Sequence, residues 1–152
     1  MTQQVLNRAE AKTLTRLFSD EGDESYIATF LKIPNKNSKL VDFIPNRAQR
    51  KILAAMRRSK RIRVLKASQL GSTSIITASF FKRTSVRANV TSVICAHEGL
   101  LARRLLTRCD VFYQNLPDDP ILKPPLDHDN ASEKRFKSIN SVIYIGSAQQ
   151  PV

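Results

Sequence analysis

Apolar residues recur at helical spacing along much of the chain. They predict five helices, at residues 5–18, 24–33, 47–58, about 73–82 and 98–116. The third is the most clearly marked, because Asn46 is a favourable N-cap residue and an apolar side opposes a basic side. In the last helix one apolar stripe is formed by Leu101, Leu105, Cys109, Phe112 and Leu116.

Runs of β-branched and other apolar residues predict the strands. One strand is expected at residues 62–66 and a second at residues 89–96. Two later runs, 135–138 and 142–145, predict a hairpin that turns at Asn140 and Ser141. The polar residues 34–39 and the proline-rich residues 117–125 predict connecting loops.

The order of these elements predicts an α/β fold with a doubly wound, mostly parallel sheet flanked by helices. Residues 1–42 would form a helical leader, and residues 43–152 would form the front part of the main domain. The sequence ends soon after the last expected strand, and so short a parallel sheet would leave apolar surface uncovered. We therefore expect the sheet to be incomplete at the C-terminus and the chain to be part of a longer protein.

Composition excludes several classes of protein. The 152 residues suit one domain, and 41% hydrophobic with 25% charged residues does not fit a disordered or collagen-like chain. No apolar run approaches the roughly 20 residues of a membrane helix, and the N-terminus lacks the order of a signal peptide. Cys95 and Cys109 lack metal-ligand spacing, so we expect buried thiols in an intracellular protein.

Positive charge is concentrated in one part of the chain. The formal net charge is +12, and residues 47–108 contain 15 basic residues against a single acid, Glu98. A charge excess confined to one stretch attracts phosphate backbones, although basic residues can also serve only to solvate helix faces. At this density we expect a polyanionic partner.

The residues between the first expected strand and the following helix carry the main candidate chemistry. The free N–H groups and dipole of a helix N-terminus favour an anion there. Measured against the phosphate-loop pattern G-x-x-x-x-G-K-[ST], Gly71 and Thr73 are in place, while Lys66 and Ser72 replace the first glycine and the lysine. The bare pattern therefore fails, and a strand, turn and helix with one glycine are common in α/β proteins.

Neighbouring side chains favour a phosphate site despite that failure. Lys66 ends the expected strand, so its ammonium group could reach the phosphates from the other side of the loop. Thr73 places a hydroxyl where Mg²⁺ would be bound. The alternatives are a solvated strand-end lysine for Lys66 and simple helix-start caps for Ser72 and Ser74.

Gln49 lies on the apolar side of the helix at residues 47–58. A buried amide needs hydrogen-bond partners, because leaving it unpaired costs about 1–3 kcal/mol. One candidate partner is the edge of an adenine, with Phe43 or Ile44 packed against the base. The other is a neighbouring loop that Gln49 would cap.

Four more residues are candidates for contacts with DNA. His97 follows the second expected strand and would lie at the carboxyl edge of the sheet, where it could contact DNA phosphates or make a structural hydrogen bond. Arg103, Arg104 and Arg108 flank the apolar stripe of the last helix and could contact DNA or another subunit, or be solvated. No triad partner accompanies either histidine, so nucleophilic catalysis is not expected, and no catalytic residue is assigned within the chain.

Taken in order, four segments resemble the large terminase subunit of tailed bacteriophages. They are residues 45–49 (Pro-Asn-Arg-Ala-Gln), 65–73 (Leu-Lys-Ala-Ser-Gln-Leu-Gly-Ser-Thr), 94–97 (Ile-Cys-Ala-His) and 143–148 (Ile-Tyr-Ile-Gly-Ser-Ala). The similarity covers residues 40–150, roughly the front of that family's P-loop ATPase domain, and the ordered set is more specific than any single motif.

The resemblance assigns roles to residues of this chain. It implies that Gln49 reads adenine and that Thr73 ligates Mg²⁺. Many relatives carry arginine at the position of Ser68, so a cation expected near the γ-phosphate is absent here. The ATP-binding residues implied by the family are Gln49, Lys66, Ala67, Ser68, Gln69, Leu70, Gly71, Ser72, Thr73 and Ser74.

The resemblance also implies a function and partners. The family's ATPase drives double-stranded DNA into a procapsid, with a small terminase subunit, the portal and other copies of the chain as partners, in the cytoplasm of an infected or lysogenic bacterium. The family's acidic Mg²⁺-binding strand, catalytic glutamate and nuclease domain should lie beyond Val152. Without these carboxylates nothing orients the attacking water, so we expect no appreciable ATPase activity from this chain alone.

Two other functions remain open. A helicase-like ATPase fragment would share the adenine-reading glutamine, the phosphate loop and the strand order, but would be followed by a second RecA-like domain. A non-enzymatic basic nucleic-acid-binding module, or a decayed prophage remnant, would bind DNA without binding nucleotide.

Overall fold

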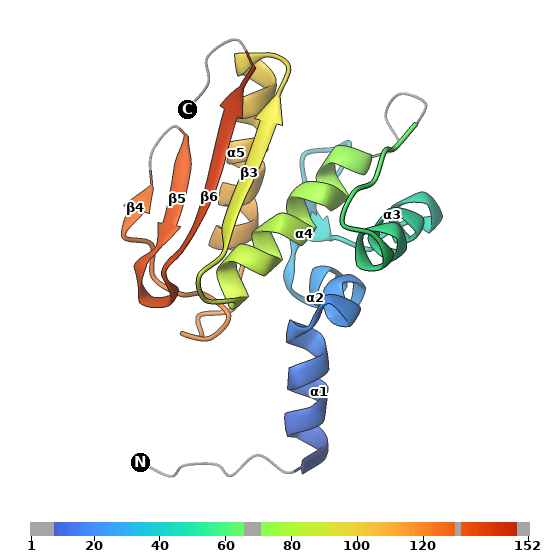
Figure 1. The fold of residues 1–152 in the computed structure, drawn as a ribbon, viewed down its shortest axis with the longest axis vertical. Helices are drawn as coiled ribbons and strands as arrows, with labels where there is room; N and C mark the ends of the chain where they lie inside the picture. The colour runs from blue at the N-terminus through green and yellow to red at the C-terminus, as the bar shows by residue number, and fades with distance from the viewer. Residues whose placement is uncertain (1–7, 66–70, 130–131, 149–152) are drawn as a thin grey trace.

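The computed structural model of the chain describes residues 8–65, 71–129 and 132–148 (Figure 1). Its helices are α1 (Arg8–Phe18), α2 (Asp23–Phe30), α3 (Arg47–Arg58), α4 (Ser72–Val86) and α5 (Gly99–Gln114), with 3₁₀ turns η1 (Asp20–Gly22) and η2 (Lys137–Ile139). Its strands are β1 (Lys32–Pro34), β2 (Leu40–Asp42), β3 (Thr91–Ala96), β4 (His128–Asp129), β5 (Glu133–Phe136) and β6 (Ser141–Ser147). No helix formed by these residues is long and apolar enough to cross a membrane.

The helix predicted at residues 24–33 is shorter than expected. It ends at Phe30, because Lys32–Pro34 pairs antiparallel with Leu40–Asp42 as strands β1 and β2. Of the residues predicted as a plain loop, 34–39, the first ends β1 and residues 35–39 form the turn of this hairpin. There the side-chain oxygen of Asn35 accepts hydrogen bonds from the N–H groups of Asn37 and Lys39. The prediction missed the hairpin because each strand has only three residues.

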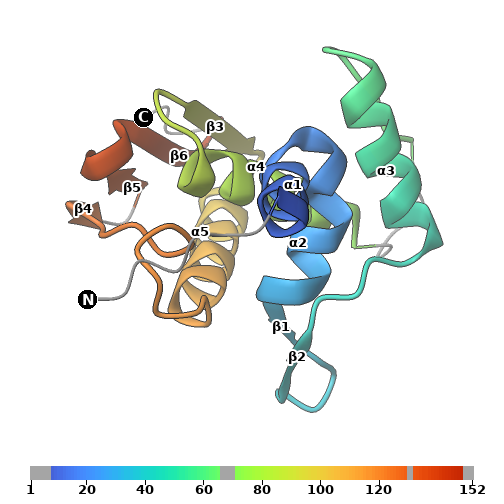
Figure 2. The ribbon, with the colours of Figure 1, turned by 90° about the horizontal axis from the view of Figure 1, so that it is seen from below.

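Helix α3 has the predicted bounds, whereas the strand predicted at residues 62–66 is wrong over the residues described. Residues 62–65 have no regular secondary structure and pair with no other described strand, and Lys66 lies outside the described residues. The physical reason is where this segment lies in the fold. It runs between α3 and α4, on the opposite side of α4 from the four-stranded sheet (Figures 1 and 2), so no described strand is near enough to pair with it.

The α/β class is confirmed, but the expected mostly parallel sheet is corrected to a mixed one. The four-stranded sheet has the order β3-β6-β5-β4, in which only β3 and β6 are parallel among the described strands. The predicted hairpin is confirmed as β5 and β6, joined through η2 and Asn140, which adopts a left-handed conformation with φ of 50°.

One face of this sheet is covered and the other is open. The hydroxyl of Thr84 in α4 contacts that of Ser92 at 2.6 Å, and the ring of Tyr113 in α5 packs against Phe136. On the opposite face of β3, Val93 is 60% exposed. Within the described residues, helices therefore flank only one face rather than both.

A single hydrophobic cluster joins the N-terminal helices to the sheet. Phe112 is fully buried and contacts both Phe43 and Phe81, at ring-centroid distances of 6.3 and 5.6 Å. Of the stripe predicted on α5, only Leu101 is exposed, because the first turn of that helix extends beyond the core. The cluster includes Tyr26, Ile27, Leu31, Phe43, Ile52, Leu53, Ile75, Phe81, Phe112, Ile143 and Ile145.

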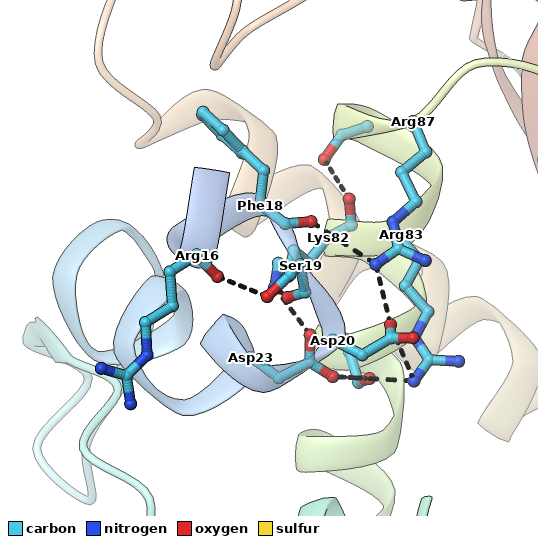
Figure 3. Close-up of polar contacts among 10 residues, drawn as sticks. Arg16, Phe18, Ser19, Asp20, Asp23, Lys82, Arg83 and Arg87 are labelled. Carbon is cyan, nitrogen blue, oxygen red and sulfur yellow. Dashed lines mark hydrogen bonds and ion pairs between the residues drawn. The ribbon is translucent and has the colours of Figure 1, made fainter. Parts of the chain in front are cut away.

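Polar contacts also join residues 18–23 to α4 (Figure 3). The ammonium group of Lys82, fully buried, donates hydrogen bonds to Asp23 Oδ1 at 2.7 Å and to the Ser19 carbonyl at 2.6 Å. Burial lowers the pKa of Lys82, and the hydrogen bond and charge of Asp23 oppose that shift. Around this pair, Arg83 and Arg87 both contact Asp20. The leader predicted at residues 1–42 thus shares its core and its ion pairs with the rest of the chain.

Candidate functional site

The start of α3 is tied to the start of α4 through Gln49. Asn46 and Gln49 form a reciprocal capping box, in which the side chain of each accepts a hydrogen bond from the backbone N–H of the other. The remaining amide group, Nε2, donates to the carbonyl of Gly71 at 3.1 Å. Gln49 is 6% exposed, so its predicted burial is confirmed. Of the two partners weighed for this amide, the neighbouring loop is present in the structure, and adenine stays a prediction.

Gly71 is the N-cap residue of α4 and requires the absence of a side chain. Its φ of 67° lies in the left-handed region, and an added Cβ would lie 2.7 Å from Nε2 of Gln49. Within the described residues, no side chain caps the helix at this residue. A helix N-terminus of this kind favours an anion.

The first turn of α4 carries three hydroxyl groups in different environments. Ser72 is buried, and its Oγ has no hydrogen-bond partner within the described part of the chain. Thr73 is exposed and Ser74 is half-buried. The rest of the predicted phosphate loop, namely Lys66, Ala67, Ser68, Gln69 and Leu70, lies outside the described residues.

A cavity of about 290 Å³ opens beside this turn. It lies between α3 and residues 62–65 and reaches Ser72 at one end. Most of its wall is apolar, and Lys51 and Arg63 supply positive charge. An apolar wall with two cations and a buried hydroxyl suits a ligand that has both a flat apolar part and an anionic part.

The two residues predicted to pack on adenine differ in their exposure to solvent. Phe43 is buried in the core and stacks on Phe112, whereas Ile44 is 62% exposed. In this conformation only Ile44 offers its side chain to a ligand.

The candidate DNA contacts on α5 lie apart from the Gly71 turn. His97 is exposed just after β3, Arg103 and Arg104 are exposed, and Arg108 is half-buried, which lowers the pKa of its guanidinium group. In both views α5 lies with the sheet on one side of α4 and α3 lies on the other (Figures 1 and 2). No hydrogen bond or ion pair among the described residues joins the four candidates to Gln49 or Gly71.

Replacing Gly71 with alanine should lower the free energy of unfolding by about 1–3 kcal/mol. The left-handed backbone penalises any L side chain, and the new methyl group would collide with the amide of Gln49. Urea unfolding followed by circular dichroism measures the change. Gly99→Ala is the matched control, since nothing lies within 4 Å of a Cβ built at Gly99. Equal effects at the two positions would contradict the role assigned to Gly71.

Sequence reasoning missed the buried Lys82–Asp23 pair. A signal was available, because Lys82 follows Ile75, Ala78 and Ser79 on the buried side of α4 at helical spacing. Among the residues that the structure describes, no three His, Cys, Asp or Glu side chains are grouped to hold a metal.

No protein-family model matches the sequence, and no curated protein matches it either.

Proposed function

We propose that this chain is the ATP-binding part of a viral DNA-packaging motor of the large-terminase kind, with a P-loop fold. In the complete protein, ATP hydrolysis would drive double-stranded DNA into a procapsid. One observation carries the proposal: a left-handed glycine at the N-terminus of α4, bonded through its carbonyl to a buried glutamine from the start of α3. The terminase resemblance predicts its adenine-reading glutamine and its phosphate loop at these two places.

The local geometry supports nucleotide binding at this turn. Helix α4 has 15 residues, so a phosphate at its N-terminus would meet the positive end of the helix dipole. The proposal assigns the ammonium group of Lys66, which precedes this helix in the sequence, to the same phosphate. Ser72 Oγ is a buried hydroxyl without a partner among the described residues, and a phosphate oxygen would supply one. Lys51 and Arg63 add positive charge to the neighbouring cavity.

Magnesium fits this site only in part. Thr73, exposed in the first turn of α4, is the residue that would hold the ion. Bound Mg²⁺ would neutralise charge on the β- and γ-phosphates. Binding without rapid hydrolysis is the expected behaviour of this chain.

Titration with a non-hydrolysable ATP analogue and Mg²⁺, followed by calorimetry, tests the proposal. We expect the wild-type chain to bind and Lys66→Ala to weaken binding by about 10–100-fold, as expected for a charge-assisted hydrogen bond. Gln49→Ala should also weaken binding, and its folding must be checked because Gln49 belongs to the capping box. Lys36→Ala, which removes an exposed lysine from the β1–β2 turn, is the matched control.

The outcome also separates the competing functions. A wild-type chain that binds DNA but no nucleotide would overturn the ATP-binding proposal and favour a non-enzymatic nucleic-acid-binding module. The basic residues of α3 and of the segment after it are the observation that favours this second candidate.

A further inference from the structure

The outer side of α3 is a unipolar basic surface. Residues 47–63 contain eight basic residues and no acid. At 100° per residue, the five that lie on α3 fall within about 120° of the helix circumference, so they share one face. This α3 basic face consists of Arg47, Arg50, Lys51, Arg57 and Arg58, together with Lys60, Arg61 and Arg63 of the following segment.

Almost none of this charge is compensated within the protein. Arg50 pairs with Glu24 at 2.7 Å, and the other seven basic residues have no ion pair in the described part of the chain. All eight residues are exposed. One or two cations in the last turn would be enough to complement the dipole of α3. Stabilisation of the helix therefore does not explain why seven basic residues have no ion pair here.

The face borders a groove between α3 and α4. Arg57, Arg58 and Lys60 line one side of this groove of about 660 Å³, and Ile76, Phe80 and Arg83 of α4 line part of the rest. The acid in its lining, Asp20, is already engaged by Arg83 and Arg87. The groove is therefore positively charged at its rim and accessible from the α3 basic face.

We propose that the α3 basic face and this groove bind the phosphate backbone of a nucleic acid. Charge complementarity supports this assignment. Seven uncompensated cations lie along a helix about 18 Å long and its continuation, and duplex DNA presents one negative charge per roughly 1.7 Å of its axis. Cations of one sign pair with phosphates whatever the base sequence, so this surface suits sequence-independent contact.

This surface differs from the one expected on α5, and it shares Lys51 and Arg63 with the cavity beside the Gly71 turn. It extends the proposed function, in which DNA is the partner, by naming where the backbone would lie. It also stands if nucleotide binding fails, because none of its argument uses Lys66 or Gln49.

The test measures binding of a fluorescent duplex and a single strand of the same sequence by anisotropy, over about 50–300 mM salt. The variant R57Q/R58Q/K60Q should bind on the order of 100-fold more weakly at about 0.1 M salt. Its salt dependence should fall by about 2.7 in slope for the duplex, or about 2.1 for the single strand, and this difference shows which form is bound. Thermal unfolding of each variant confirms that it is folded.

Two controls make the result specific. K12Q/K36Q/K39Q removes the same charge from exposed positions elsewhere and should bind nearly as the wild type does. R103Q/R104Q tests the face on α5. The proposal is overturned if the control variant loses as much affinity as R57Q/R58Q/K60Q, if only R103Q/R104Q loses affinity, or if the wild type binds no nucleic acid. Equal binding of polyglutamate, with the same salt dependence, would instead identify an acidic protein as the partner.

Discussion

Replacing Lys82 with methionine is expected to lower the free energy of unfolding by about 3 kcal/mol. Lys82 is fully buried, and its ammonium group lies 2.7 Å from a carboxylate oxygen of Asp23, which is 2% exposed. Methionine fills a similar volume without charge, so Asp23 stays buried and loses its nearest cation. The hydrogen bond from Ser79 to Asp23 remains, which holds the loss near the lower end of the 3–5 kcal/mol range, roughly, for breaking buried pairs.

Thermal unfolding with a double variant distinguishes the ion pair from simple packing. The single variant should unfold roughly 10 °C below the wild type. K82M/D23N should lose less stability than the sum of its two single variants, by about 0.5–3 kcal/mol, because the second change removes the buried charge that the first left with only the longer 3.9 Å contact to Arg83. The exposed pair Lys32–Asp42, at 3.7 Å, is the matched control, and K32M should change stability by less than about 0.5 kcal/mol. Equal losses in K82M and K32M would contradict the role given to the buried pair.

The parts of the fold that depend on neighbouring residues could be predicted from the sequence. Helix α3 begins and ends where expected, because its cap, its apolar side and its basic side all lie within about 13 residues. The hairpin of β5 and β6 was predictable for the same reason, since its turn and both arms are close in the sequence.

The sheet shows where local patterns fail. Residues 62–65 have the composition of a strand, but a strand exists only if another one pairs with it, and the sequence does not specify that distant partner. The same limit explains why the sheet is mixed rather than mostly parallel. The direction of β5 is set by its hairpin with β6, whereas β3 and β6 are brought together across 50 residues.

In the candidate site, too, the sequence predicts which side chain is buried but not which residue it bonds. Helical spacing predicted that Gln49 is buried, but not that its amide would bond Gly71, 22 residues away. Lys82 is the stronger case. A lysine on an apolar face is tolerated here because Asp23, 59 residues earlier, lies beside it, and only the tertiary structure reveals that proximity.

Replacing Phe112 with alanine is expected to lower the free energy of unfolding by about 3–5 kcal/mol. Phe112 is fully buried on α5, and its ring contacts Phe43, which precedes α3, and Phe81 in α4. Truncation would leave a cavity between three segments that rigid helices cannot easily close. Leu100→Ala on the same helix is the control, because Leu100 is 58% exposed and should change stability by less than about 0.5 kcal/mol.

The same variant tests whether the N-terminal helices unfold with the sheet. The chain has no tryptophan, so its three tyrosines report on tertiary structure by fluorescence: Tyr26 in α2, Tyr113 in α5 and Tyr144 in β6. Since Phe43 and Phe112 belong to one hydrophobic cluster with Tyr26, a destabilised core should expose Tyr26 in the same transition that unfolds the sheet. In urea, the version of Phe112→Ala with Y113F and Y144F keeps only Tyr26, and the version with Y26F keeps only Tyr113 and Tyr144. Both should give the same midpoint by fluorescence and by circular dichroism. Two separate midpoints would mean that residues 1–42 form an independent unit, because a shared core cannot unfold in halves.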